Sequence, residues 1–222
     1  MNLRCIYDIP RFCDINIALD EIFLTKENFE EIFRFYRWLK PSYTIGYFQK
    51  YPVKEDSYPV IRRLTGGLSV LHNKDLSYSL IVSDKMWPYI YNQEKTYKLV
   101  HETIRKSLKT INIICDDTSK KVDTIKNYCC VNTLYKDDLL LNGKKIVGSC
   151  QRRRGTRILV EGSIHLDLQE EQKKIFTRNF FKILSETLKC DTTDSFVNNI
   201  DLNLAKKLCE EKYNKDKWNK LF

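Results

Sequence analysis

The chain has 222 residues, of which 42% are hydrophobic and 12% aromatic, a composition that excludes a disordered chain and can supply a sizeable core. No apolar run approaches the ~20 residues that cross a bilayer, and the start MNLRCIYDIP lacks the apolar stretch of a secretory signal. The formal net charge of +9 suits an acidic protein or a nucleic acid as partner, and charge alone does not choose between them.

Helical and strand-like patterns are mixed from the start of the chain. Apolar residues at helical spacing predict a helix over 16–24, and alternating aromatic residues predict a strand over 32–38. Strand-like runs follow at 43–48, 60–72 and 76–82, and a glycine pair interrupts the second of these. This part of the chain therefore predicts one helix followed by several short strands.

The second half of the chain continues this mixture. An apolar stripe predicts a helix from 93 to about 110, and Asn-Gly between two apolar runs at 138–149 predicts a hairpin. The stretch 157–168 predicts another strand pair or a bent strand, and two amphipathic helices follow at roughly 170–189 and 201–213.

Together these patterns predict an α+β fold in which helices pack on a mostly antiparallel or mixed β-sheet. With no linker or repeat, residues 1–222 are expected to form a single domain without an accessory C-terminal domain. The eight cysteines contain no CxxC pair, so no metal site is predicted. Without a secretory signal, they indicate free thiols in a reducing cytoplasm.

A glycine pair beside two arginines is the first candidate for chemistry: Gly66 and Gly67 follow Arg62 and Arg63. Such a pair lets the backbone approach a ligand, and adjacent arginines can hold a phosphate. The same pair can also mark only a bulge or a tight turn in a strand. Because strand neighbours point to opposite faces, Arg63 can equally be a surface residue.

Three long stretches carry a resemblance to a known family. They are RFYRWLKPSYTIGYFQ (34–49), RRLTGGLSVLHNKDLSYSLIV (62–82) and LLLNGKKIVGSCQRRRGTRILVEGSIHLDL (139–168). In order and spacing they resemble the signatures of the lipoate–protein ligase and octanoyltransferase family, and NIALDEIFL (16–24) resembles that family's first helix. The resemblance implies the fold shared with biotin ligases and the delivery of an eight-carbon acyl chain to a lysine of a lipoyl-domain protein.

The resemblance also implies roles for single residues. Lys145 matches the lysine of the family's GKKI-x-GS motif and would bind the acyl carbonyl oxygen, while Lys144 would point to water. His72 could line the pocket, although a structural role suits a lone histidine better. Glu161 stands where the family often has histidine, and His165 where it usually has an aliphatic residue. The substrate-binding residues implied are Arg62, Arg63, Gly66, Gly67, His72, Gly148, Ser149, Gly162 and Ser163.

The family divides into two mechanisms at a cysteine. Its ligases activate lipoate with ATP, whereas its transferases use a thiolate to take octanoyl from acyl carrier protein. In the transferase subgroup whose motifs are most similar to this sequence, the nucleophile precedes the hairpin glycine by 13 residues. Counting back 13 residues from Gly143 gives Cys130. A thiolate can attack a thioester and hold the acyl group, and a cation such as Lys145 would lower the pKa of the thiol. A buried packing role is the alternative for Cys130, and Cys129 could substitute for it.

The sequence therefore predicts a transferase of octanoyl or lipoyl groups with no cofactor, acyl carrier protein as donor and lipoyl-domain proteins as acceptors. Chain length favours this interpretation because many ligases append a further domain, whereas the tail KYNKDKWN (212–219) resembles the end of ligase domains. The first alternative is an ATP-dependent lipoate–protein ligase that uses free lipoate, ATP and Mg²⁺. The second is a non-catalytic basic binding module, although the basic residues lack the aromatic interleaving of RNA-binding motifs.

Overall fold

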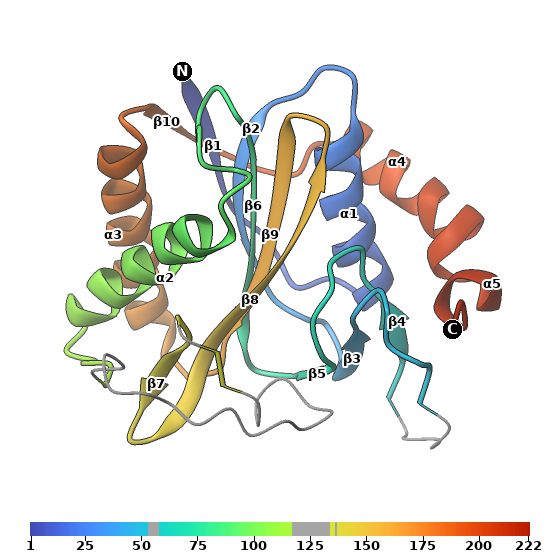
Figure 1. Ribbon diagram of the computed structural model, residues 1–222, viewed down its shortest axis with the longest axis horizontal. Helices are drawn as coiled ribbons and strands as arrows, with labels where there is room; N and C mark the ends of the chain where they lie inside the picture. Colours follow the sequence, from blue (N-terminus) through green and yellow to red (C-terminus); the bar gives the residue numbers. More distant parts are fainter. Residues whose placement is uncertain (53–57, 117–133, 136) are drawn as a thin grey trace.

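The computed structural model describes residues 1–222 except 53–57, 117–133 and 136. A large sheet has the strand order β10-β1-β2-β6-β9-β8-β7, and a small sheet has the order β4-β3-β5 (Figure 1). The strands of the large sheet are β1 (Asn2–Tyr7), β2 (Glu31–Tyr36), β6 (Leu76–Ser83), β7 (Leu139–Leu141), β8 (Lys144–Arg154), β9 (Arg157–Ile164) and β10 (Asp191–Ser195). The small sheet consists of β3 (Ser42–Ile45), β4 (Val60–Arg62) and β5 (Val70–His72).

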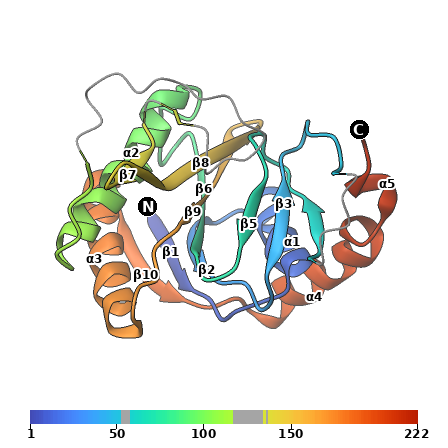
Figure 2. The same ribbon diagram turned by 90° about the horizontal axis from the view of Figure 1, so that it is seen from below.

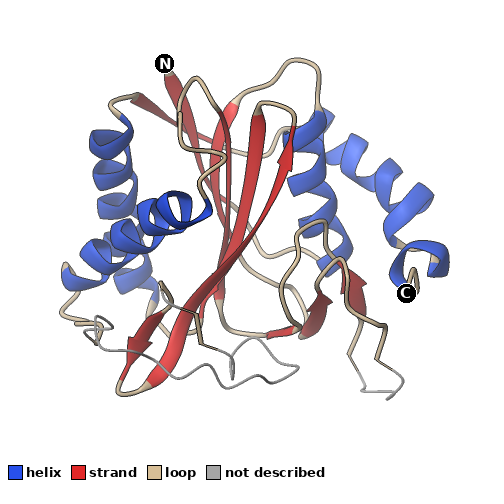
Figure 3. Ribbon diagram, in the orientation of Figure 1, coloured by secondary structure: helices blue, strands red, loops and turns tan. Residues whose placement is uncertain are grey.

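Helices cover both faces of the large sheet (Figure 3). They are α1 (Cys13–Thr25), α2 (Gln93–Lys109), α3 (Glu170–Leu188), α4 (Asn199–Leu208), the π-helical turn η2 (Cys209–Tyr213) and α5 (Asp216–Asn219). One hydrophobic core joins the sheet to α2 and α3, and a second joins it to α1, α4 and η2. Every residue of the central strand β6 is buried because both of its faces are covered.

The predicted α+β class and mixed sheet are confirmed. The helices expected at 16–24, 93–110 and 170–189 correspond to α1, α2 and α3. The pairs β2–β6, β6–β9, β8–β9 and β7–β8 are antiparallel, whereas β1 pairs in parallel with both β2 and β10. The Asn-Gly hairpin also forms, with φ of 51° at Asn142 and 72° at Gly143.

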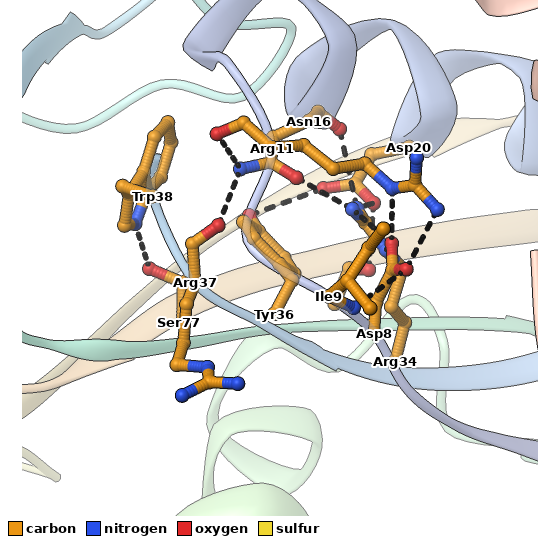
Figure 4. Close-up of polar contacts among 11 residues, drawn as sticks. Asp8, Ile9, Arg11, Asn16, Asp20, Arg34, Tyr36, Arg37, Trp38 and Ser77 are labelled. Atoms are coloured by element: carbon orange, nitrogen blue, oxygen red, sulfur yellow. Dashed lines mark hydrogen bonds and ion pairs between the residues drawn. The ribbon is translucent and has the colours of Figure 1, made fainter. Parts of the chain in front are cut away.

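A buried ion-pair network fixes α1 to the sheet (Figure 4). The guanidinium of Arg34 on β2 is fully buried, and its Nη2 lies 2.9 Å from Asp8 Oδ2. Its Nη1 lies 3.1 Å from Asp20 Oδ1 on α1, and its Nη2 also donates to Asn16 Oδ1 at 2.6 Å. The hydroxyl of Tyr36 donates to Asp20 as well, at 3.3 Å. The network thus sets the position of Tyr36, whose ring borders the cavity described next.

Candidate active site

A cavity of about 580 Å³ is lined by residues of both sheets and of α1 and α2. The small sheet lies on the α1 side of the large sheet (Figure 2), so the loop between β4 and β5 comes to the cavity wall. Most of the predicted substrate-binding residues meet there. The cavity is lined by the predicted catalytic residue Lys145 and by the predicted substrate-binding residues Arg63, Gly66, Gly67, His72, Gly148, Ser149, Gly162 and Ser163.

The glycine loop packs against Gly46, directly after β3, in a way that only glycine allows. Gly67 has a φ of 86°, in the left-handed region that favours glycine. A Cβ on Gly46 would lie 2.0 Å from the carbonyl oxygen of Gly67, so the two backbones touch. The guanidinium of Arg63 donates at 2.8 Å to the carbonyl oxygens of both Gly66 and Leu68. Arg63 is therefore a buried residue that fixes this loop, which corrects the surface alternative.

Arg62 lies outside the cavity lining, and its side chain is fully buried elsewhere. Its Nη1 donates to the carbonyl oxygens of Gly46, Tyr47 and Gln49 at 3.0, 2.7 and 2.7 Å. Its Nη2 donates to the carbonyl oxygen of Asn219 at 2.8 Å. The structure thus corrects the predicted phosphate-binding role: this guanidinium ties the chain near α5 to the segment after β3.

Lys145 is buried and extends over a glycine. Its Nζ lies 2.7 Å from Asp138 Oδ2, and both side chains are almost fully enclosed. A Cβ on Gly148 would lie 2.5 Å from Lys145 Cε, so this glycine makes room for the lysine. Lys144 is exposed, as the strand alternation predicts. An ammonium is therefore held at a fixed point of the cavity by Asp138, a partner that the sequence patterns did not reveal.

His72 forms part of a rigid wall of the cavity. Its Nδ1 lies 2.8 Å from Asp75 Oδ2, its Nε2 lies 3.0 Å from Thr44 Oγ1, and its ring stacks on Trp38 at 4.0 Å. Because a carboxylate only accepts, Nδ1 carries the proton toward Asp75. Burial alone would raise the pKa of Asp75, but the contact with His72 brings it below its usual value.

The carboxyl group of Glu161 on β9 lines the cavity. Cys150 on β8 also lines it and is the residue paired with Glu161 in the sheet. Glu161 accepts a hydrogen bond from the hydroxyl of Thr65, and that hydroxyl lies 3.0 Å from Cys150 Sγ. Burial, and next the nearby carboxylate of Asp20, raise the pKa of Glu161 to about 7. Among the described residues, Glu161 Oε1 has no hydrogen-bond partner.

Ser149 connects a histidine and a tyrosine at the other side of β8. Its Oγ lies 2.6 Å from His101 Nε2 and 2.5 Å from the hydroxyl of Tyr78. A Cβ on Gly162 would lie 2.3 Å from that tyrosine oxygen, so this glycine makes room for Tyr78. Burial lowers the pKa of His101. The sequence patterns missed His101 because it lies within the apolar stripe of α2, beside Val100.

The arrangement suits the binding of a polarised carbonyl beside a chain of carbon atoms. A fixed ammonium can stabilise negative charge on an oxygen, and aromatic and aliphatic side chains of the wall can contact a hydrocarbon. The predicted nucleophile Cys130 lies outside the described residues. Over the described ranges, no group of three His, Cys, Asp or Glu side chains could hold a metal. In the same ranges, no helix is both long and apolar enough to span a membrane.

Residues 13–215 match the family described as Lipoyl protein ligase A/B catalytic domain. The chain is 33% identical over 172 residues to octanoyltransferase LipM of Oceanobacillus iheyensis, covering 73% of the chain and 63% of that protein. The aligned part is thus less than two thirds of the length of that relative. The chain is also 26% identical to octanoyltransferase LipM of Halalkalibacterium halodurans, in an alignment that covers 92% of the chain and 93% of that protein.

The fold is shared with solved lipoate–protein ligases. Lipoate-protein ligase A bound with ATP superimposes with a TM-score of 0.79 at 22% identity, covering 100% of both chains. A bipartite lipoate protein ligase from Thermoplasma acidophilum superimposes with a TM-score of 0.71 at 21% identity, covering 100% of this chain and 98% of that one. These likenesses confirm the predicted ligase-like fold.

Proposed function

We propose, since the chain belongs to the lipoyl protein ligase A/B catalytic domain family, that it transfers an octanoyl or lipoyl group to a specific lysine of a lipoyl-domain protein. The similarity to proteins named octanoyltransferase LipM supports octanoyl transfer from a thioester donor, for which acyl carrier protein is the proposed carrier. This reaction needs no resident cofactor. The free state of the described cysteines is compatible with a reducing cytoplasm as its location.

The placement of Lys145 in the cavity is the observation that carries the proposal. As a nucleophile adds to the acyl carbon, negative charge develops on the carbonyl oxygen, and the ammonium beside it stabilises that charge. Asp138 at 2.7 Å holds the ammonium in place before the reaction, so no reorganisation is needed during it. The loop of Gly66 and Gly67, fixed by Arg63, lines the same cavity.

The acyl chain would lie between the two sheets. Trp38, Leu68 and Val70 supply apolar surface there, and His72 and Ser163 complete the wall. Slots that combine such surface with a few placed polar groups are typical of sites for small ligands.

The proposed nucleophile is Cys130, whose thiolate would attack the thioester carbon and release the carrier thiol. The acyl-enzyme would then yield its acyl group to the lysine amine of the acceptor. Cys150 lines the cavity and gives a matched control for this role. Mass spectrometry after incubation with octanoyl-carrier protein should find an octanoyl adduct that Cys130→Ser abolishes and Cys150→Ser retains. The reverse pattern would move the nucleophile to Cys150.

A comparison of two donors tests the function itself. Octanoyl-carrier protein without ATP is expected to acylate a lipoyl-domain protein, and free lipoate with ATP and Mg²⁺ is not. Product formed only with lipoate and ATP would instead assign an ATP-dependent ligase.

A further inference from the structure

We propose that Ser149 and His101 form a relay that accepts a proton from the amine of the acceptor protein's lysine during acyl transfer. The inference rests on the proposed function and adds to it the groups that move the proton. Both side chains line the same cavity as Lys145. Amine attack on a thioester releases a proton from nitrogen, so a placed acceptor accelerates it.

The hydrogen bonds of the relay have one consistent direction. His101 Nδ1 contacts the carbonyl oxygen of Asp137, which only accepts, so Nδ1 carries the imidazole proton. His101 Nε2 is then an acceptor, and the hydroxyl of Ser149 donates to it across 2.6 Å. The Ser149 oxygen in turn accepts from the hydroxyl of Tyr78 at 2.5 Å. In hydrolase triads an imidazole, there held by a carboxylate, likewise takes up the proton of a serine hydroxyl.

The charge state of each member fits this direction. Burial lowers the pKa of His101, so the imidazole is neutral and able to accept a proton at neutral pH. Burial raises the pKa of Tyr78, so its hydroxyl stays a donor. The other titratable groups that act on His101 are Asp137, Asp138 and Lys145. Tyr97 stacks on the imidazole one turn earlier on the same helix, at 6.0 Å.

The relay lies next to the proposed carbonyl site along β8. Ser149 follows Gly148, the residue over which the Lys145 side chain lies. The hydroxyl of Ser149 is half-buried and borders the cavity, whereas His101 is buried behind it. An incoming amine can therefore reach Ser149 directly, and His101 acts through it.

Protons and bonds balance in this scheme. The uncharged amine nitrogen forms a bond to the acyl carbon, and the C–S bond of the thioester breaks. The proton leaving nitrogen passes to Ser149 Oγ while the serine's own proton passes to His101 Nε2. The imidazolium then returns a proton by the reverse route to the departing thiolate, so both side chains end as they began.

His101→Gln is the sharpest test. The amide of glutamine can donate to the Asp137 carbonyl and accept from Ser149, but it cannot take up a proton. The single-turnover rate of octanoyl transfer to a lipoyl-domain protein is expected to fall about 100-fold or more. Octanoate affinity, followed by tryptophan fluorescence because Trp38 lines the cavity, should stay within about twofold. The wild-type rate should fall at acidic pH as His101 becomes protonated, at a pH below the usual histidine pKa because burial lowers the pKa of His101. This fall should be missing in His101→Gln.

Ser149 variants make the test independent of the folding of any one protein. The single-turnover rate of Ser149→Ala should fall by a factor similar to that of His101→Gln. The double variant His101→Gln/Ser149→Ala should be no slower than either single variant, because the two residues act in one relay. Ser149→Thr keeps the hydroxyl and should retain most of the rate.

A His101→Gln rate within about threefold of wild type, an unchanged fall of the rate at acidic pH, or single losses that multiply in the double variant would overturn the relay. If the wild type itself transfers no octanoyl group, the proposed function fails instead.

Discussion

A buried ammonium such as that of Lys145 is stable only beside an opposite charge, which Asp138 supplies. Lys145→Met leaves the Asp138 carboxylate enclosed without its partner. We expect the free energy of unfolding to fall by about 3–5 kcal/mol and acyl transfer to be lost. Urea unfolding and a transfer assay measure the two effects.

The double variant Lys145→Met/Asp138→Asn separates stability from catalysis. Removing both charges should recover much of the free energy of unfolding, because no lone charge stays buried. Transfer should remain absent, since no cation faces the carbonyl oxygen. Activity recovered together with stability would contradict the proposed role of Lys145.

The carboxyl of Glu161 predicts an unusual pH dependence. Its pKa is about 7 in the folded chain and 4.5 for an ordinary glutamate, so the folded state binds the proton more tightly. Stability should therefore fall as pH rises from about 4.5 to about 7, by up to about 1.4 kcal/mol per pH unit. Glu161→Gln should remove this decline, and measurements of the free energy of unfolding across the same pH range test it.

Glu171→Gln is the matched control for Glu161, because Glu171 is exposed at the start of α3. It should leave the pH profile of stability unchanged. If Glu161→Gln and Glu171→Gln behave alike, the carboxyl in the cavity does not titrate as described.

At the scale of elements, Arg34 determines how firmly α1 is joined to the sheet. Arg34→Met removes the cation that Asp8 and Asp20 share, so Asp8 keeps Arg11 while Asp20 stays buried without that cation. The free energy of unfolding should fall by about 3–5 kcal/mol. Arg37→Met is the control, because its partner Glu170 is largely exposed and such a pair contributes about 0–1 kcal/mol. Equal losses in the two variants would contradict a structural role of the network.

The contact between β3 and the glycine loop gives a second prediction at this scale. A Cβ at Gly46, directly after β3, would meet the Gly67 carbonyl at 2.0 Å, so Gly46→Ala must push the loop away from this residue. We expect octanoate binding to weaken at least about tenfold, since a wall of the cavity moves. Gly155→Asn, in the turn between β8 and β9 with a φ of 56° that Asn tolerates, should bind octanoate as the wild type does.

Much of the fold could be predicted from periodicity, and what escaped depends on pairing across long distances. β10 has the sequence DTTDS, with no apolar residue to suggest a strand, and it forms because it pairs in parallel with β1. The predicted helix over 201–213 is divided between α4 and η2. Periodicity gives local geometry, whereas the partner of an edge strand is set by the rest of the sheet.

The candidate site shows the same division. The alternation of side chains along a strand correctly predicted that Lys144 is exposed and that Lys145 lies on the other face. It could not predict which of Arg62 and Arg63 faces the cavity. That choice depends on the segment at Asn219, more than 150 residues away, whose carbonyl takes up the Arg62 guanidinium. Likewise, the Asn-Gly pattern predicted the hairpin of β7 and β8, but it did not predict the register shift between Leu139 and Leu140 or the contact of Asp138 with Lys145.

At the scale of the whole molecule, the net charge of +9 bears on how protein partners arrive. Lys144, Arg152 and Arg154 are exposed on β8, the strand that borders the cavity. These residues should steer an acidic carrier protein or lipoyl-domain protein to the site. Reversing all three to glutamate should lower kcat/KM for the lipoyl-domain acceptor about tenfold at low salt.

The position of the charge, and not only its sum, should decide the effect. Reversing Lys174, Lys206 and Lys207, which are exposed on α3 and α4, changes the net charge equally but lies away from the cavity lining. At about 0.1 M salt, charges interact over roughly 10 Å, so this second triple variant should alter kcat/KM much less. With a small uncharged octanoyl thioester as donor and water as acceptor, both variants should match the wild type. Equal losses in the two triple variants would mean that net charge alone, without a docking face along β8, accounts for the attraction.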